Sequence, residues 1–384
     1  MVYSIRRGEY LSGKDIRVGM QFVDLARQYR EYKDAIDASI RGNIERTSFI
    51  GGDGKKLEET LAAYVGVKHG IGCGSGTDAL LLPLLAIGIQ PGDEVITTPF
   101  TFIATAEVIA FIGAKPVFVD IDESTYNIDV KKIEAAVTKR TKAMIPVSLY
   151  GQAADMDAIN AIAAEHRLVV IEDAAQSFGA VYKGRKSCAL SAVAATSFFP
   201  SKPLGAYGDA GMAFTNDDDI AAKMRSLLNH GQTERYVHKY IGLNFRLDSI
   251  QAGILLAKFG GFEKEAESRA RIGKRYTELL AGAPLITPKL APYTDRSVFA
   301  QYSVRVKGRE KVIAHLTSKG IPTAVHYPIP VHLQEAYRTK EYGEGSMPVS
   351  EMVAREIMSV PMHAFLTDDE QRTVADALRE AVTV

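Results

Sequence analysis

Lys202 is the residue whose surroundings point most directly to chemistry. It lies in Ser197-Phe-Phe-Pro-Ser-Lys-Pro-Leu-Gly205, directly after an apolar run, and its neighbours are mostly apolar, proline or glycine. Desolvation lowers the pKa of a lysine, so its free amine can attack a carbonyl and form a Schiff base. Ser197, five residues earlier, is placed to offer its hydroxyl to a phosphate. A solvated surface lysine is the alternative that this motif leaves open.

An aspartate ends a second apolar run, in the motif Ile171-Glu-Asp-Ala-Ala-Gln-Ser177. The carboxyl ends of parallel strands face the crevice in which open α/β sheets bind their ligands. There the carboxylate of Asp173 could pair with a protonated ring nitrogen of a cofactor. Aspartate is also a common N-cap, and the isolated motif favours that role in a following helix.

A glycine-rich turn, Gly72-Cys-Gly-Ser-Gly-Thr77, follows another apolar run and precedes a helical pattern. Gly74 and Gly76 allow close approach to an anion, and the free N–H groups at a helix start attract it. A plain tight turn is an equally good interpretation. The dinucleotide fingerprint requires glycine where Thr77 stands, which disfavours an NAD-dependent dehydrogenase.

The fourth motif is the segment Gly242-Leu-Asn-Phe-Arg-Leu-Asp248, which carries two polar side chains two positions apart. In an extended chain, Asn244 and Arg246 point the same way, and both suit a phosphate or a carboxylate. The alternative is a turn followed by a helix N-cap at Asp248.

Short apolar runs alternate with amphipathic segments over most of the chain, which predicts an α/β fold with a largely parallel sheet between helices. We expect strands at 67–73, 94–98, 116–120, 143–149, 168–173 and 194–198, and helices at 77–87, 101–112, 129–137 and 155–165. After a further apolar run at 211–215, a long, nearly unbroken helical pattern predicts a helix over 248–281. Strands at 302–306 and 323–325 and helices at 309–318 and 368–381 then indicate a smaller α/β domain. The predicted division is an extension over 1–19, a large domain over 20–265 and a small domain over 266–384.

The composition excludes several functional classes. Lys plus Arg and Asp plus Glu number 46 each in 384 residues, so no overall positive field attracts nucleic acid or an anionic membrane. The two cysteines have no metal-ligand spacing, which predicts no metal site and a reducing, cytoplasmic setting. No apolar run reaches the roughly 18 residues of a membrane span, and the first 19 residues lack the apolar core of a signal peptide.

Taken in order, these motifs resemble the DegT-type sugar-nucleotide aminotransferases of the fold type I class, from Met20 to the C-terminus. The resemblance implies a seven-stranded, mostly parallel sheet and the cofactor pyridoxal 5′-phosphate, which becomes pyridoxamine phosphate during the cycle. It also implies glutamate as amino donor and a homodimer with shared active sites. Keto-sugar dehydratases of the family have histidine at the position of Lys202, so the lysine indicates transamination. A non-catalytic, regulatory member is the remaining alternative.

The resemblance also implies roles for single residues. Lys202 would bind the cofactor covalently and carry protons. Asp173 would hold the pyridine nitrogen, Gln176 the phenolic oxygen, and Ser197 with Gly76 and Thr77 the phosphate. Phe102 would stack on the ring, although a core phenylalanine is the alternative. Asn244 would reach the phosphate of the neighbouring subunit.

The segment Ala324-Val-His-Tyr-Pro-Ile-Pro330 resembles enzymes that aminate carbon 3 of the sugar. Three further stretches, Ser148–Gln152, Tyr182–Cys188 and Phe199–Gly205, closely resemble aminotransferases for UDP-2-acetamido-2-deoxy-3-oxo-glucuronate, which serve bacterial O-antigen and lipopolysaccharide synthesis. His326 and Tyr327 would then contact the sugar, and Arg246 would bind its carboxylate or the cofactor phosphate. The alternatives are a dTDP-3-keto-6-deoxyhexose and a 4-keto sugar.

Overall fold

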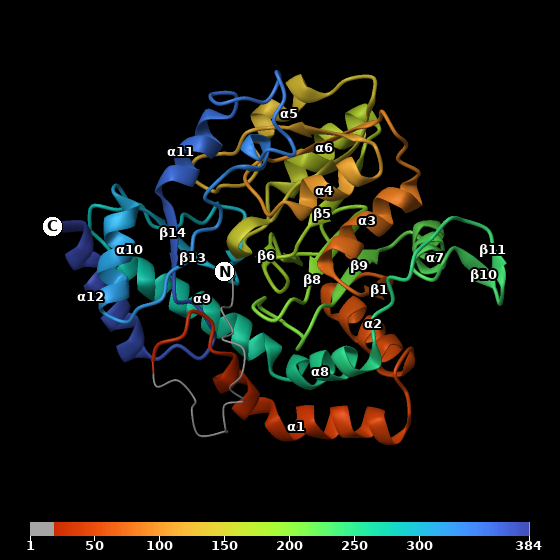
Figure 1. Ribbon diagram of the computed structural model, residues 1–384, viewed down its shortest axis with the longest axis horizontal. Helices are drawn as coiled ribbons and strands as arrows, with labels where there is room; N and C mark the ends of the chain where they lie inside the picture. The colour runs from red at the N-terminus through yellow and green to blue at the C-terminus, as the bar shows by residue number, and fades with distance from the viewer. Residues whose placement is uncertain (1–18, 384) are drawn as a thin grey trace.

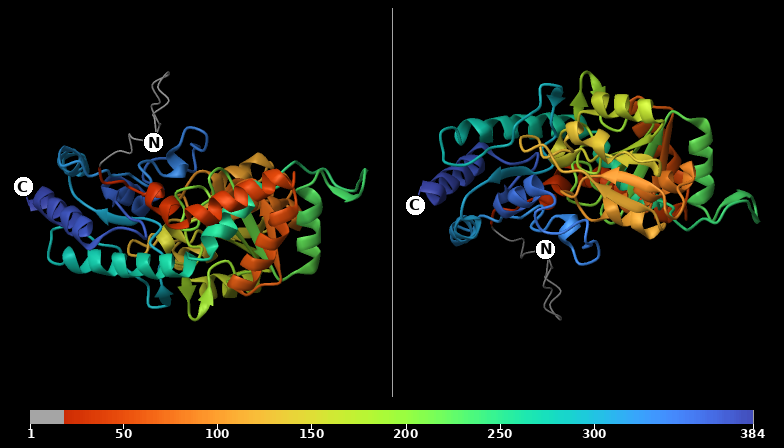
Figure 2. Two further views of the ribbon diagram at one scale, coloured as in Figure 1. Left: turned by 90° about the horizontal axis from the view of Figure 1, so that it is seen from below. Right: turned by 90° about the horizontal axis from the view of Figure 1, so that it is seen from above.

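A seven-stranded sheet forms the centre of the molecule in the computed structural model, which describes residues 19–383 (Figures 1 and 2). Its order is β1-β9-β8-β5-β4-β2-β3, and β9 alone runs antiparallel to its neighbours. This confirms the expected mostly parallel α/β sheet. The strands are β1 (His69–Cys73), β2 (Glu94–Thr97), β3 (Lys115–Phe118), β4 (Thr141–Ile145), β5 (Val169–Asp173), β8 (Val193–Ser197) and β9 (Gly211–Thr215).

Helices cover both faces of this sheet because successive strand residues point to opposite sides. Ala213 packs into the core beneath α3 (Gly76–Ile87), α4 (Ala104–Phe111) and α7 (Asp218–Leu227), whereas Phe214 packs against α2 (Gly52–Val65) and α8 (Ser249–Phe259). Helices α5 (Val130–Ala136) and α6 (Met156–His166) share a further core with β2, β4 and β5. The strands are therefore buried on both faces, as their continuous apolar runs predict.

The nearly unbroken helical pattern over 248–281 predicted a single helix, but the chain breaks at Gly260 and Gly261 into α8 and α9 (Phe262–Leu279). The tight packing against α1 (Leu25–Glu45) explains the second glycine: a Cβ at Gly261 would lie 2.7 Å from Cε1 of Tyr32. Apolar periodicity continues through the break, so it could not reveal the change of direction.

A separate core lies around a two-stranded sheet of β13 (Tyr302–Arg305) and β14 (Ile357–Val360). Helices α9, α10 (Arg309–Ser318) and α12 (Asp368–Thr383) surround it, with α11 (Pro348–Glu356) nearby (Figure 1). The predicted strand at 323–325 is wrong: only Ala324 pairs, through an isolated bridge to Ser359. The second core agrees with a C-terminal α/β region, and the domain limits at 20–265 and 266–384 stay a prediction.

Two small sheets lie outside these cores. The hairpin of β10 (Gln232–Glu234) and β11 (Val237–His238) projects away from the body of the molecule (Figure 2). A three-stranded sheet joins β12 (Thr294–Arg296), β6 (Val181–Tyr182) and β7 (Arg185–Lys186). Between residues 19 and 383, no helix combines the length and apolar composition needed to cross a membrane.

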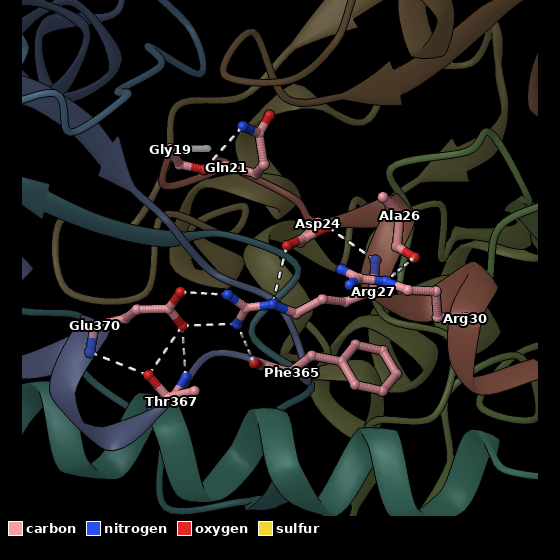
Figure 3. Close-up of polar contacts among 9 residues, drawn as sticks. All are labelled: Gly19, Gln21, Asp24, Ala26, Arg27, Arg30, Phe365, Thr367 and Glu370. Carbon is pink, nitrogen blue, oxygen red and sulfur yellow. Dashed lines mark hydrogen bonds and ion pairs between the residues drawn. The ribbon is translucent and has the colours of Figure 1, made fainter. Parts of the chain in front are cut away.

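Helix α1 is joined to α12 of the C-terminal region by an ion pair between Arg27 and Glu370 (Figure 3). The Nη1 and Nη2 atoms of Arg27 donate to the two carboxylate oxygens of Glu370 at 2.8 and 2.6 Å, and Nη1 also donates to the carbonyl of Phe365. This two-pronged geometry orients both side chains. The predicted extension over 1–19 lies, apart from Gly19, outside the described residues.

Candidate active site

Lys202 lies in a loop directly after β8, as the sequence predicts. Its N–H donates to the carbonyl of Phe199 at 2.9 Å, and the N–H of Ala206 donates to the carbonyl of Phe198 at 2.7 Å, so the loop folds back on itself. Gly205 permits this fold, because a Cβ there would lie 2.8 Å from the Phe199 carbonyl. Lys202 is only partly exposed. Desolvation lowers the pKa of its amine, and the nearby carboxylate of Asp173 partly opposes that shift.

Asp173 ends β5 as a buried carboxylate. Oδ2 accepts a hydrogen bond from the hydroxyl of Thr105 at 2.8 Å, and Oδ1 accepts from the N–H of Ala175 at 3.1 Å. Burial raises the pKa of Asp173, while these two bonds and the Lys202 cation lower it. The following residues form turns, so Asp173 caps no helix. The role of helix N-cap, which the isolated motif favoured, is therefore excluded for Asp173.

The glycine-rich turn leads into α3 and brings that helix against Ser197. Ser75 is the N-cap, and its hydroxyl accepts from the N–H of Asp78 at 3.1 Å. A Cβ at Gly76 would lie 2.6 Å from Cβ of Ser197, so only glycine allows this approach. As the first helical residues, Gly76 and Thr77 have N–H groups without intrahelical acceptors. The helix start and the serine therefore form a favourable site for an anion.

The predicted ring-binding residues meet around Tyr327. The Gln176 amide donates to the hydroxyl of Tyr327 at 3.0 Å, and its Oε1 accepts from the N–H of Tyr150 at 2.9 Å. The Phe102 ring centroid lies 6.2 Å from that of Tyr327, and Phe102 is 57% exposed. Phe102 is thus not a core residue, and its face is available to a planar ligand.

His326 lies on the side of the site contributed by the C-terminal region. Its Nδ1 lies 3.1 Å from the hydroxyl of Ser359, and its backbone carbonyl accepts from the hydroxyl of Tyr150. Burial and the nearby Lys202 cation lower the pKa of His326 to about 4. The imidazole is consequently neutral at neutral pH. The ring of Phe22, at 6.1 Å between centroids, packs beside it.

Thr105 and Tyr150 are two residues that sequence reasoning missed as contributors to the site. Thr105 holds the Asp173 carboxylate from α4, 68 positions away in sequence. Tyr150 has a positive φ of 56° and joins Gln176 to His326. Nothing in the local sequence distinguished either residue, because their partners are distant in sequence.

Asn244 and Arg246 lie apart from this cluster, and no contact within residues 19–383 joins them to Lys202. Both side chains are exposed, and the Nε of Arg246 donates to Oδ1 of Asn244 at 2.9 Å. The backbone of Arg246 pairs with Cys73 at the end of β1. Its side chain lines an open cavity of about 640 Å³ together with Lys55, Lys68 and Arg225. The pair therefore faces outward, away from Lys202.

The site fits a pyridoxal phosphate group. A desolvated amine, a buried carboxylate, an exposed aromatic face and an anion-binding helix start surround one region, and the close approach of Gly76 to Ser197 forms the phosphate end. Within residues 19–383, no group of three or more His, Cys, Asp or Glu side chains is arranged to hold a metal ion. The fold and these residue types define a pyridoxal-phosphate-dependent aminotransferase of fold type I.

The chain belongs to the DegT/DnrJ/EryC1/StrS aminotransferase family, whose pattern matches residues 30–379. It is 50% identical over 360 residues to UDP-2-acetamido-2-deoxy-3-oxo-D-glucuronate aminotransferase of Pseudomonas aeruginosa, covering 94% of this chain and 99% of that protein. It is 48% identical over 367 residues to a pleiotropic regulatory protein of Geobacillus stearothermophilus, covering 94% and 98%.

A solved structure is similar as well. NtdA from Bacillus subtilis, determined with bound cofactor PMP (pyridoxamine phosphate), superposes with a TM-score of 0.88 at 28% identity. The match covers 97% of this chain and 87% of that one. The aminotransferase class and the pyridoxal phosphate cofactor expected from the motifs are thereby confirmed.

Proposed function

We propose that the chain transfers an amino group from glutamate to carbon 3 of UDP-2-acetamido-2-deoxy-3-oxo-glucuronate, for a bacterial surface polysaccharide. The observation that carries this proposal is the 50% identity to the Pseudomonas aeruginosa enzyme for that substrate, over almost the full length of both chains. The His326–Tyr327 segment supports it, because it lies against Gln176 and beside Lys202, where a sugar ring would reach the amine.

Each site residue has a definite task in this reaction. When bound, pyridoxal phosphate supplies an electron sink that stabilises negative charge on the reacting carbon. Asp173 would keep the ring nitrogen protonated, and Thr105 holds the carboxylate in place. Gln176 would bind the phenolic oxygen, while Ser197 and the first N–H groups of α3 would bind the phosphate. Phe102 would stack on one face of the ring.

Lys202 has two tasks. Its amine would hold the cofactor when no substrate is bound. Once released, it would act as a base where a carbon loses a proton and, then protonated, as the acid that delivers a proton to the sugar carbon from a single face. The lowered pKa of the amine favours the free base, which is the form that binds a carbonyl and removes a proton. Neutral His326 can accept or donate a hydrogen bond to a sugar hydroxyl without adding charge.

The proposed assembly is a cytoplasmic homodimer in which Asn244 reaches the phosphate of the neighbouring site. Arg246 would bind the uronate carboxylate or that phosphate. The outward position of both side chains supports this, because neither contacts Lys202 of its own chain.

A panel of reverse half-reactions tests the substrate. The protein in its lysine-bound cofactor form is mixed separately with UDP-2-acetamido-3-amino-glucuronate, a dTDP-3-amino-6-deoxyhexose and a 4-amino sugar nucleotide. We expect only the uronate to remove the visible absorption band of the lysine-bound cofactor. Loss of the band with a dTDP-sugar or a 4-amino sugar would replace the substrate while keeping the reaction. No reaction with any amino sugar or with glutamate would favour a regulatory role, as in the name of the Geobacillus stearothermophilus relative.

A further inference from the structure

Lys258 is a buried lysine that the proposed reaction does not use. It lies on α8, is 1% exposed, and burial lowers the pKa of its amine to about 8. Burying an ammonium group is costly, and an apolar side chain would fill the same space at lower cost. Its role must therefore depend on the polar contacts that the amine makes.

The amine of Lys258 contacts the loop that carries Lys202. Its Nζ donates a hydrogen bond to the carbonyl of Gly205 and lies 5.0 Å from the centroid of the Tyr207 ring. Gln251, two turns earlier on the same face of α8, accepts from the N–H of Tyr207 at 2.8 Å. Helix α8 thus holds the loop at two points just after Lys202.

The charge of Lys258 is balanced on its other side by α9 and α1. The Glu265 carboxylate favours the protonated amine, and the Arg269 guanidinium opposes it. Both are nearly fully buried, and Gln28 of α1 donates to Glu265 at 2.9 Å. Oε1 of Gln28, Nε of Arg269 and the hydroxyl of Tyr207 are buried and have no hydrogen-bond partner among residues 19–383. The helices thus surround a buried polar cluster, and Lys258 joins it to the loop.

We propose that Lys258 is a positioning residue for Lys202, fixing the loop 198–206 through the carbonyl of Gly205. The loop is otherwise held by few backbone bonds, and a misplaced amine reacts slowly even when its chemistry is intact. The inference rests on the proposed role of Lys202.

The test compares three variants as cofactor-free and as loaded protein. Lys258→Met keeps the length of the side chain and removes the donor. Lys258→Arg keeps a cationic donor, and Arg269→Met removes a cation that bonds the carbonyl of Phe299 rather than the loop. Amide hydrogen exchange of the peptide 198–207 in the cofactor-free protein reports the loop independently of activity. The rate of the glutamate half-reaction then reports whether the amine of Lys202 is correctly placed.

We expect Lys258→Met to speed amide hydrogen exchange in this peptide and to leave the exchange rates in β5 and α12 unchanged. The half-reaction should slow by about 10- to 100-fold. The glutamate concentration that gives half of the maximal rate should change by less than about twofold. Lys258→Arg should restore part of both effects, and Arg269→Met should leave the loop exchange unchanged. Equal loosening of the loop in Arg269→Met, or wild-type exchange in Lys258→Met, would overturn the proposal.

A folding control completes the design. If Lys258→Met does not fold, Lys258→Gln is measured in its place. Failure of both variants to fold would show that Lys258 is needed for folding of the whole chain, and would overturn the positioning role. Wild-type protein that accepts no amino sugar would contradict the proposed function, while the exchange of the loop would still report on Lys258.

Discussion

The hydroxyl of Thr105 donates to Oδ2 of Asp173 at 2.8 Å, joining the first turn of α4 to the end of β5. Both residues are buried. A second threonine, Thr101, lies 3.0 Å from the Thr105 hydroxyl and extends the contact. The carboxylate that we propose to bind the cofactor nitrogen is thus oriented by a helix distant in sequence, and a rigid carboxylate is a condition for holding the ring in one position.

The variant Thr105→Val should weaken cofactor binding. The change keeps the side-chain shape and removes a hydrogen bond to a charged group, worth about 1.5–3 kcal/mol, so the dissociation constant should rise by about tenfold or more. Titration of the cofactor-free protein with pyridoxal phosphate measures it. Thr97→Val is the matched control, because Thr97 is equally buried and donates to the Ile145 carbonyl instead. Equal affinity in the two variants would show that Thr105 does not hold Asp173.

The variant Lys202→Ala should fold normally and lose turnover by several orders of magnitude. The amine is the only group proposed both to bind the cofactor and to move the proton, and no side chain recorded beside it in the described chain can replace it. Steady-state rates and circular dichroism measure the two quantities. Turnover within about tenfold of the native protein would remove Lys202 from the mechanism.

His326 should make stability pH-dependent in a defined window. Its pKa is lowered from 6.5 to about 4 in the folded state, so the unfolded chain binds more protons between these values. The free energy of unfolding should therefore fall as the pH falls from about 6.5 to about 4. Denaturant titrations of native protein and His326→Gln should diverge in this window. The pKa of His363 is also lowered to about 4, but this residue is present in both proteins, so its contribution to the pH dependence is the same in each. Parallel pH profiles would contradict the prediction.

Shared active sites predict complementation between two inactive variants. Lys202→Ala lacks the amine, and Asn244→Ala lacks the group proposed to reach across to the partner. Each should be inactive or weak alone. After unfolding and refolding together, mixed dimers should regain activity, because one of their two sites combines an intact lysine with an intact asparagine. A mixture no more active than its components would place Asn244 in its own subunit's site or outside the site.

The ion pair of Arg27 and Glu370 should stabilise the fold. The contact with Arg27 lowers the pKa of Glu370 to about 2. Its stabilisation is therefore present above the ordinary carboxyl pKa of 4.5 and is lost as the pH falls toward 2. Glu370→Gln should lower the free energy of unfolding at neutral pH by about 1 kcal/mol, measured with denaturant.

Glu380→Gln is the matched control for this ion pair. It makes the same substitution on the same helix, α12, at an exposed pair with Lys319. We expect almost no change in the unfolding midpoint, because exposed pairs are screened by water and salt. Equal loss of stability in the two variants would show that the contact between α1 and α12 has no special effect.

Much of the fold followed from local patterns. The apolar runs that end at Cys73, Asp173 and Ser197 became strands of one parallel sheet, because residues buried on both faces must be continuously apolar. The break at Gly260–Gly261 could not be predicted in this way. The close approach of Tyr32 from α1 requires a glycine at 261, and a contact between segments more than 200 positions apart leaves no mark in local periodicity.

The sequence by itself determined the reaction class through its resemblance to the DegT-type family, which rests on the type and order of Lys202, Asp173 and the glycine turn before Thr77. Only the tertiary structure decided which groups orient them. Thr105, Tyr150 and Lys258 act through partners brought close by packing of the sheet, α4 and α8. It also decided that Arg246 faces outward, away from the lysine of its own chain. The physical reason is that hydrogen bonds act over about 3 Å in space, whatever the separation along the chain.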